Sequence, residues 1–284
     1  MKEQNRNTPS KPDSTLGAGP SLPPAWRLKA IGAFPLPISI FMVAAFNLLL
    51  PAPSQLSKSL VFDSPYLFIG LQVVFLTLTS SLVGFISLRG YMQTGSTTLI
   101  LLGAGALSWG TGSFIAGLYL TQPNIGISIS NTSALVASLF HLTSGIIASR
   151  SISSRARPTL RKPFLTLAYA GVLGFCGIFT IMCISGIIPP FFVPGVGQTW
   201  LRMAVLESAS GLMAVSSGIF ARLYLSSRSN ILYWYFLALG LTAAGLGAVF
   251  FGRAPGDPIS WTGRAAMFLG GVYFVKAVSS SFKR

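Results

Sequence analysis

Charged side chains are scarce in this sequence. Only 9% of its 284 residues are Asp, Glu, Lys or Arg, whereas an ordinary soluble domain carries roughly 25%. Hydrophobic residues make up 51% of the chain, and the mean hydropathy is +0.67. A chain with so few charges cannot cover a water-facing surface, so the composition indicates an integral membrane protein.

Residues that carry chemistry are also few, with five acids, one histidine and two cysteines. The sequence has no phosphate-binding loop with lysine, no paired carboxylates, no Cys/His cluster and no nucleophile elbow. We therefore expect a protein that is not an enzyme and that uses no metal or other cofactor. Cys176 and Cys183 are seven residues apart in one apolar run, about 10 Å along a helix, which is too far for a disulfide. They are interpreted as small packing residues.

Eight apolar runs are each long enough to cross a bilayer. They cover residues 30–50, 65–88, 98–120, 126–149, 163–188, 200–225, 231–251 and 261–280. Backbone in lipid must satisfy its own hydrogen bonds, so these runs predict an all-α bundle of eight transmembrane helices over residues 25–284. Pro35 and Pro37 predict a kink or a late helix start in the first run. Residues 1–24, rich in Pro, Ser, Thr and Gly, predict a disordered cytoplasmic tail.

The placement of positive charge predicts the orientation. With the N-terminus inside, sixteen of the 20 Lys and Arg residues fall on the cytoplasmic side, as the positive-inside rule requires. The four on the outer side are Lys58, Arg202, Arg253 and Arg264. Both termini are then cytoplasmic, in the cell (inner) membrane. The net charge of +15 is explained by the anionic lipid surface, so we expect no nucleic-acid partner.

The two halves of the chain resemble each other. At an offset of 135 residues, four glycines of the third run coincide with four of the seventh. They are Gly105, Gly110, Gly112 and Gly117 against Gly240, Gly245, Gly247 and Gly252. This pattern favours a parallel 4+4 repeat with halves 25–157 and 158–284, although chance similarity between glycine-rich runs is the alternative.

Small residues at helical spacing predict the faces where helices pack. Such stripes run through Ala106, Gly110, Ser113 and Gly117; through Ala134, Ser138, His141 and Gly145; and through Gly211, Ala214 and Gly218, with Gly271 in the last run. His141, Glu207 and the nearby Asn131 are therefore expected to face the bundle interior. For His141 the alternatives are a bond to a Ser or Thr hydroxyl and a ligand role. For Glu207 they are a structural anchor and a role in ligand or proton sensing.

The outer mouths of the sixth and eighth runs suggest a ligand site. Trp200, Arg202, Glu207, Trp261 and Arg264 gather there. We expect Glu207 and Arg264 to make contact and close the floor of a pocket, with residues 189–199 as its lid. The alternative is a protonated Glu207 that donates to a neighbouring hydroxyl. The apolar, aromatic mouth suits a small amphiphilic ligand.

Three stretches of the sequence carry a family resemblance. They are LLGAGALSWGTGSFIAGLYLTQPNIGISISN, IIPPFFVPGVGQTWLRMAV and YWYFLALGLTAAGLGAVFFG with WTGRAAMFLGGVYFV. Their motifs are Trp-Gly-x-Gly-Ser, Pro-Asn, Pro-Pro-Phe-Phe and Trp-x-Gly-Arg. The chain resembles the membrane-integral sensory (MASE-type) domains of sensor histidine kinases and related signalling proteins, here without the kinase. The resemblance implies perception of a signal in the membrane and its transfer to a cytoplasmic module.

The expected function is accordingly a non-catalytic sensory or ligand-perception module in the lipid bilayer. Its partner is expected to be a cytoplasmic histidine kinase or another signalling protein, contacted through the basic loop at 150–162 or the C-terminal end of the last run. The alternatives are a small-solute transporter or permease, and a structural subunit of a membrane complex.

Overall fold

The structure is a computed structural model that describes residues 25–51, 61–62, 64–119, 121–150, 156–193, 196–253 and 256–280. The chain divides into two compact units, Met1–Phe34 and Pro35–Arg284. In the first unit, α1 (Ala25–Ala33) is described. The predicted tail, residues 1–24, lies outside the described residues. The break between α1 and the next helix falls directly before Pro35, which confirms the predicted interruption at this proline.

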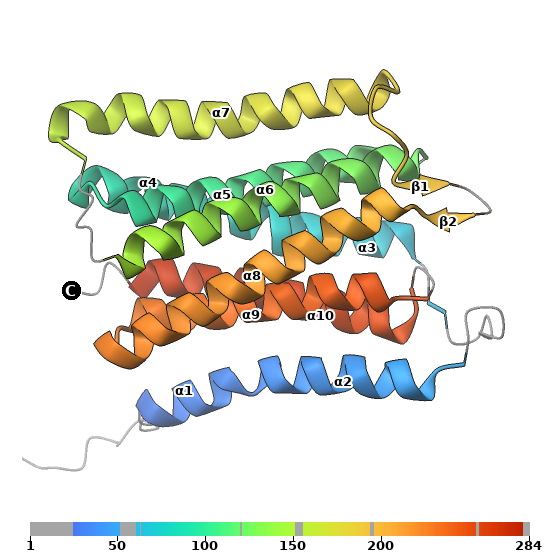
Figure 1. Cartoon of the computed structure of the whole chain (residues 1–284). Helices are drawn as coiled ribbons and strands as arrows, with labels where there is room; N and C mark the ends of the chain where they lie inside the picture. Colours follow the sequence, from blue (N-terminus) through green and yellow to red (C-terminus); the bar gives the residue numbers. More distant parts are fainter. Residues whose placement is uncertain are drawn as a thin grey trace, which may run out of the picture. The chain divides into compact units, whose positions relative to one another are not determined.

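The second unit is a bundle of long helices with one short hairpin (Figure 1). Its elements are α2 (Pro35–Leu49), α3 (Pro65–Gln72), η3 (Val73–Leu78), α4 (Thr79–Thr94), α5 (Thr97–Leu118), α6 (Pro123–Ser149), α7 (Pro158–Ile184), β1 (Phe192–Val193), β2 (Gly197–Gln198), α8 (Trp200–Ser227), α9 (Asn230–Phe251) and α10 (Pro258–Ser279). Segment η3 is a π-helical turn that continues α3 directly into α4. The strands β1 and β2 pair antiparallel. The predicted all-α bundle is confirmed.

Seven helices in the described part of the chain are long and apolar enough to cross a membrane. They are Arg27–Leu49, Ile69–Thr94, Thr97–Leu118, Pro123–Ser149, Pro158–Ile184, Trp200–Ser227 and Asn230–Phe251. The eighth predicted span corresponds to α10, which is 22 residues long and carries Arg264 and Lys276. It is not among the seven, but it packs against α9 and α4 within the same bundle. The protein is therefore a multi-pass membrane protein.

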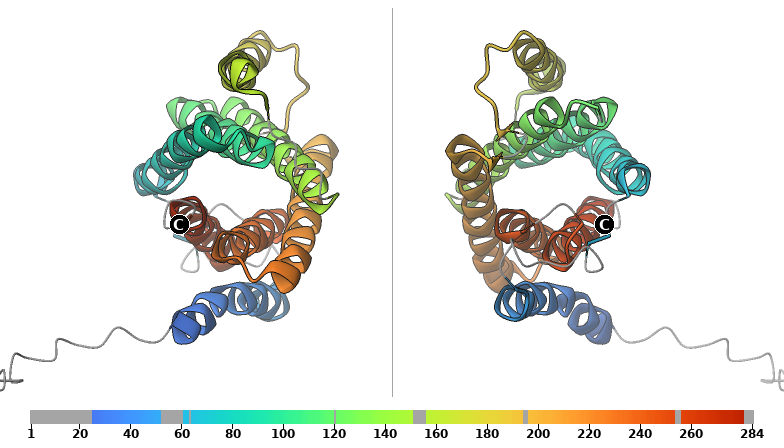
Figure 2. Two further views of the ribbon diagram at one scale, coloured as in Figure 1. Left: turned by 90° about the vertical axis from the view of Figure 1, so that its left-hand side faces the viewer. Right: turned by 90° about the vertical axis from the view of Figure 1, so that its right-hand side faces the viewer.

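Six long helices form a closed ring within this unit, with the continuous α3–η3–α4 segment counted as one helix. In order around the ring they are α3–η3–α4, α5, α6, α8, α9 and α10, and α10 packs back against α4. The two remaining helices lie outside the ring on opposite sides (Figure 2): α7 packs against α5 and α6, and α2 packs against α9 and α10. The ring has a central space that a ligand can occupy, and each outer helix supports one side of it.

The ring repeats its own pattern in the two halves of the chain. The helices α6 and α10 begin on Pro123 and Pro258, which are 135 residues apart, and α2 and α7 end on Leu49 and Ile184, also 135 apart. The packing corresponds as well: α7 rests on α5 and α6 as α2 rests on α9 and α10. All these helices run in the same direction as their counterparts, since each is the fourth long helix after its counterpart. Helix order, helix ends and packing therefore agree with the parallel 4+4 repeat.

Close helix crossings depend on small residues. A Cβ added at Gly112 of α5 would lie 1.9 Å from Oγ of Ser133 on α6. In the second half, a Cβ at Gly245 of α9 would lie 2.6 Å from the carbonyl oxygen of Gly263 on α10. Small residues let helix backbones approach where lipid gives no hydrophobic drive for association. The predicted packing stripes on α6 and α10 are buried at the positions named above, and the stripe on α5 is buried except at Gly117, which is half-buried.

The predicted packing stripe on α8 is wrong. Gly211, Ala214 and Gly218 are exposed, and no atom of a neighbouring element lies within 4 Å of a Cβ added at either glycine. The buried face of α8 instead consists of Leu206, Ala209, Met213, Ser216 and Phe220. Both faces repeat at three- and four-residue spacing, so periodicity alone could not separate them.

Candidate functional site

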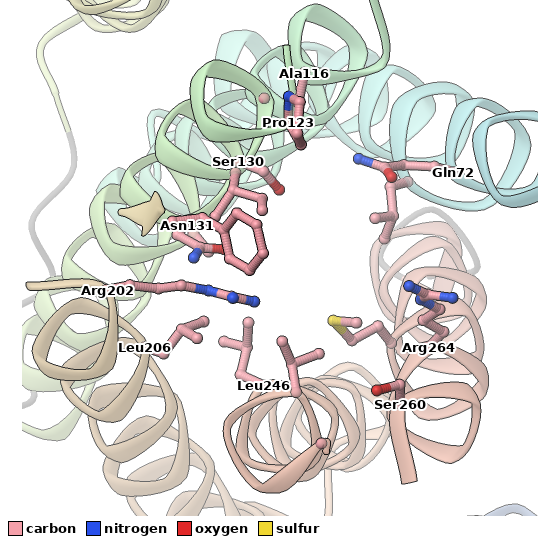
Figure 3. A pocket seen from close by; sticks show the side chains of 18 of the residues that line it. Gln72, Ala116, Pro123, Ser130, Asn131, Arg202, Leu206, Leu246, Ser260 and Arg264 are labelled. Carbon is pink, nitrogen blue, oxygen red and sulfur yellow. The ribbon is translucent and has the colours of Figure 1, made fainter. Parts of the chain in front are cut away.

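A cavity of about 620 Å³ lies inside the ring at the end of the bundle that carries the hairpin, here called the hairpin end. It is lined by residues of α3, η3, α5, α6, the hairpin, α8, α9 and α10 (Figure 3). Ligand pockets in proteins typically measure about 300–1,000 Å³. The cavity is therefore of a suitable size for a small-molecule ligand, and we name it the hairpin-end cavity.

The walls of the hairpin-end cavity are mainly apolar. Leu206 and Leu246 form part of one wall, and Trp109, Met267 and Phe268 line the cavity from α5 and α10. Polar side chains are interspersed among them: Gln72, Ser130, Asn131, Gln198, Arg202, Arg253, Ser260 and Arg264. Apolar walls with a few convergent polar groups are typical of sites that bind small organic molecules.

Three of the lining side chains are arginines, and the described lining residues include no Asp or Glu. The guanidinium of Arg253 is engaged with backbone, because it donates to the carbonyl oxygens of Asn47, Leu50 and Pro51 at the C-terminal end of α2. Arg264 lies over the ring of Trp261 at 4.9 Å. The charged side chains in the described lining are therefore all positive, and the nearby buried carboxylate of Asp257 accepts from the backbone N–H groups of the lining residues Arg253 and Ser260.

Arg202 differs from the other two arginines. Its Nε atom is buried and has no hydrogen-bond partner within the described part of the chain. The same is true of Nδ2 of Asn131 and of Oε1 of Gln198. Figure 3 shows Asn131 next to Arg202 and Arg264 on the opposite wall. Buried polar groups in proteins are nearly always hydrogen-bonded, so this cluster has unused capacity to bind polar atoms.

The π-helical turn shapes one side of the cavity. Gln72 directly precedes η3, and Leu76 belongs to it; both line the cavity. Nε2 of Gln72 donates to the carbonyl of Ser113, and the hydroxyl of Thr77 donates to the carbonyl of Gly110. Local π-helical turns in long helices are frequent at functional sites. Here hydrogen bonds from Gln72 and Thr77 fix the π-helical segment to α5. Gln72 and Leu76, on successive turns of the α3–η3–α4 helix, both line the cavity.

Below the cavity, the ring is filled by aromatic side chains. Nδ1 of His141 lies 2.7 Å from the hydroxyl oxygen of Tyr235. The His141 ring stacks on Phe274 with centroids 5.2 Å apart, and Tyr235 packs edge-on against Phe220 at 4.4 Å. All four side chains are buried. This cluster, here called the aromatic plug, closes the ring between the hairpin-end cavity and the opposite end.

The hairpin lies over the cavity. Phe192, Gly197 and Gln198 line it from this side. Oδ1 of Asn124, at the start of α6, accepts hydrogen bonds from the backbone N–H groups of Phe191 and Phe192. The motifs Pro-Asn and Pro-Pro-Phe-Phe, which are far apart in the sequence, therefore meet at this contact. The segment predicted as a lid does line the cavity.

The structure brings together part of the predicted site. Arg202, Arg264 and Asn131 line the cavity, and Trp261 packs under Arg264 without lining it. Nε1 of Trp261 donates to the carbonyl of Phe62, which lies at the entrance to α3.

Two predicted site residues lie elsewhere. The Trp200 side chain is 74% exposed, and Glu207 is also exposed, so neither lines the cavity. The predicted Glu207–Arg264 contact is therefore wrong. The physical reason is the rotation of α8: Arg202 and Leu206 face the cavity, and Glu207 is about 100° further round the helix. None of the described lining residues carries a carboxylate, although we expected Glu207 at the floor of the pocket.

For His141, the structure agrees with a hydroxyl partner across a helix contact, although the partner is Tyr235 rather than Ser or Thr. The described residues contain no group of three or more His, Cys, Asp or Glu side chains placed to hold a metal ion. Cys176 and Cys183 are both buried and free.

Sequence reasoning missed Gln72, Trp109, Asn124 and Gln198. Trp109 and Asn124 belong to motifs that the sequence analysis singled out, so their presence in the motifs was the available signal. Gln72 gave no signal, because its partner, the carbonyl of Ser113, is on a different helix.

Comparison of the chain with family models, curated proteins and solved structures finds no match. The resemblance to sensory domains thus rests on the sequence motifs alone.

Proposed function

We propose that this protein is a membrane-integral ligand-perception module. It binds a small amphiphile in the hairpin-end cavity and signals to a cytoplasmic partner, without catalysing a reaction itself. In this proposal the hairpin end faces the outside of the cell membrane, as the charge distribution predicts. The observation that carries the proposal is the cavity itself, which has the size of a small-molecule site and has the buried aromatic plug beneath it.

The aromatic plug is the reason for preferring perception over transport. A transporter needs a site near the middle of the membrane that opens alternately to both sides. Here His141, Tyr235, Phe220 and Phe274 fill the ring beneath the cavity. A ligand that enters at the hairpin end therefore meets packed side chains rather than a continuation of the path.

The repeat provides a route for the signal. The cavity lies where the two halves meet, because α6 packs against α8 and α10 packs against η3 and α4. The same helices extend to the opposite end of the bundle, where α8 ends at Ser227 and α10 at Ser279. A ligand that binds one arrangement of the halves more tightly shifts the population toward it. A cytoplasmic histidine kinase or another signalling protein would detect the change at these helix ends.

The other predicted contact surface, residues 150–162, is described only in part. Arg161 donates through Nη1 to the carbonyls of Met92 and Gln93, at the end of α4. The backbone N–H of Ala156 donates to the carbonyl of Gly95. This segment is therefore fixed to the α4–α5 turn, and it can follow a movement of α4 directly.

The test combines binding and flux on the same purified protein. The probe is a long-chain alkyl phosphate, whose charged head crosses a bare bilayer slowly. We expect the probe to stabilise the protein against unfolding by about 2.7 kcal/mol at a concentration 100 times its Kd. We also expect no flux in proteoliposomes above that of protein-free vesicles. Stabilisation together with protein-dependent flux would support the transporter alternative instead, and the absence of any binding would contradict the proposed ligand site.

A further inference from the structure

We infer that the ligand of the hairpin-end cavity is an amphiphile with an anionic head, a carboxylate or a phosphate, bound by Arg202 and Asn131. This inference rests on the proposed function, because it names the class of ligand for the same cavity. The inference is drawn from the charges and the unused hydrogen-bonding groups of the lining. It assigns to Arg202 the selection of ligands with an anionic head group.

The first step concerns charge. The described lining contains three guanidinium groups and no carboxylate. Arg253 is bonded to the carbonyls at the end of α2, and Arg264 lies against Trp261. Arg202 has its Nε buried without a partner among the described residues. Arg202 is half-buried and reaches into a largely apolar cavity, where a cation without a counter-charge is costly, so an anionic ligand would supply what the lining lacks.

The second step concerns geometry. Nδ2 of Asn131 is a second buried donor without a partner in the described structure. It belongs to α6, whereas Arg202 belongs to α8; these two helices pack against each other, and both side chains line the cavity, on the same side of it in Figure 3. Carboxylate and phosphate oxygens accept several hydrogen bonds at once, and the planar guanidinium matches them with two parallel donors. An alcohol offers a single oxygen and no charge, so it would leave Arg202 uncompensated.

The third step concerns the rest of the ligand. Around the polar group, the lining is formed by Leu206, Leu246, Met267, Phe268 and Trp109. A volume of about 620 Å³ is far more than a small inorganic anion fills. An apolar chain attached to the head would occupy this space and remove its own surface from water. Gln198, an amide on the lid, can present either its oxygen or its NH₂ group to the head by rotation.

The experiment uses the full chain in nanodiscs of a zwitterionic lipid and measures equilibrium binding. The long-chain probes share one tail and differ in the head: oleate, oleyl phosphate, oleyl alcohol and oleylamine. Acetate and inorganic phosphate serve as heads without a tail. We expect both anionic amphiphiles to bind at least tenfold more tightly than the alcohol, the amine and the two short anions. The relative affinity of oleate and oleyl phosphate then distinguishes a fatty acid from a lipid phosphate.

Two variants of α8 provide the matched comparison. Arg202→Gln removes the cavity guanidinium, and Arg222→Gln removes an exposed one near the opposite end of the same helix. Arg202→Gln should weaken binding of both anionic probes roughly ten- to hundredfold, the range expected for a lost charged hydrogen bond. It should leave binding of oleyl alcohol unchanged, and Arg222→Gln should change neither. The ligand-free Arg202→Gln protein should melt at the same or a higher temperature, because it no longer buries an uncompensated charge.

The outcomes separate the two levels of the proposal. Equal binding of oleate and oleyl alcohol, or normal oleate binding by Arg202→Gln, would contradict the requirement for an anionic head and leave an amphiphile-binding cavity. If inorganic phosphate bound as tightly as oleyl phosphate, the requirement for an apolar tail would be contradicted. If none of the long-chain probes binds to the folded wild-type protein, both this inference and the proposed function fail.

Discussion

The side-chain oxygen Oδ1 of Asn124 accepts a hydrogen bond from the backbone N–H of Phe191, with 2.8 Å between the oxygen and the nitrogen. It accepts a second hydrogen bond from the backbone N–H of Phe192, at 3.0 Å. One side chain at the start of α6 thus satisfies two consecutive backbone donors of the segment that follows α7. Because Phe192 lines the cavity, this bond holds the lid of the hairpin-end cavity in place.

Removal of this bond should loosen the lid. In Asn124→Ala, the two N–H groups lose their acceptor, at a cost of about 1–3 kcal/mol, and the hairpin should open more often. We expect a bound alkyl phosphate to dissociate roughly tenfold faster, measured by displacement with excess probe. Asn124→Asp keeps an acceptor oxygen at the same place and should retain slow dissociation. Equal rates in the Ala and Asp variants would show that Asn124 does not hold the lid.

The aromatic plug should contribute to stability through one hydrogen bond. Tyr235→Phe leaves the buried His141 without its hydroxyl partner, so we expect the free energy of unfolding to fall by about 1–3 kcal/mol. Unfolding in detergent, followed by circular dichroism, measures it. The control is Tyr66→Phe, since the Tyr66 side chain is 84% exposed. A plug variant as stable as this control would mean that the bond contributes nothing.

Glycine substitutions should distinguish the ring from the outer helix α7. In Gly112→Ala, the new methyl group would lie 1.9 Å from Oγ and 2.3 Å from Cβ of Ser133. Overpacking of this kind typically costs about 1–3 kcal/mol, so α5 and α6 should separate and the protein should lose stability. Gly171→Ala on α7 meets nothing within 4 Å and should be neutral or slightly stabilising. The comparison is made by thermal melting, and a neutral Gly112→Ala would contradict the close crossing.

Orientation is tested by labelling single cysteines in intact cells. The background replaces Cys176 and Cys183, which are both buried. Val196→Cys in the hairpin, where the native side chain is 83% exposed, should react with a membrane-impermeant thiol reagent from outside. Ser226→Cys, near the end of α8, should react only after the cells are opened. The reverse pattern would place the cavity on the cytoplasmic side.

Much of the fold could be predicted from the sequence because lipid leaves few choices. Runs of about 20 apolar residues must be helical. Pro123 and Pro258 occupy the first positions of α6 and α10, where the missing N–H of proline costs least. The glycine offset between the two halves was also visible in the sequence, although the α5–α6 crossing is closest at Gly112 and its counterpart Gly247 makes no such close contact.

The candidate site could be predicted only in part. Arg202 and Arg264 were candidates because they lie at the outer mouths of the sixth and eighth runs, and both line the cavity. Glu207 was placed in the cavity because it shares a stripe of small residues, yet it is exposed. The rotation of α8 depends on packing against both α6 and α9, and such long-range contacts leave no pattern in one helix. The π-helical turn that follows Gln72 is equally invisible in the sequence.

Photo-crosslinking with a fatty acid that carries a diazirine in its tail tests the central claim, that the hairpin-end cavity is the ligand site. The protein is irradiated in zwitterionic nanodiscs, and the labelled peptides are identified by mass spectrometry. The account predicts adducts on cavity residues such as Trp109, Met267 and Phe268, lost with excess oleate and strongly reduced in Arg202→Gln. Leu173 and Ile178 of α7 are exposed, lipid-facing positions. The account would be contradicted if the adducts were confined to such positions and excess oleate left them unchanged.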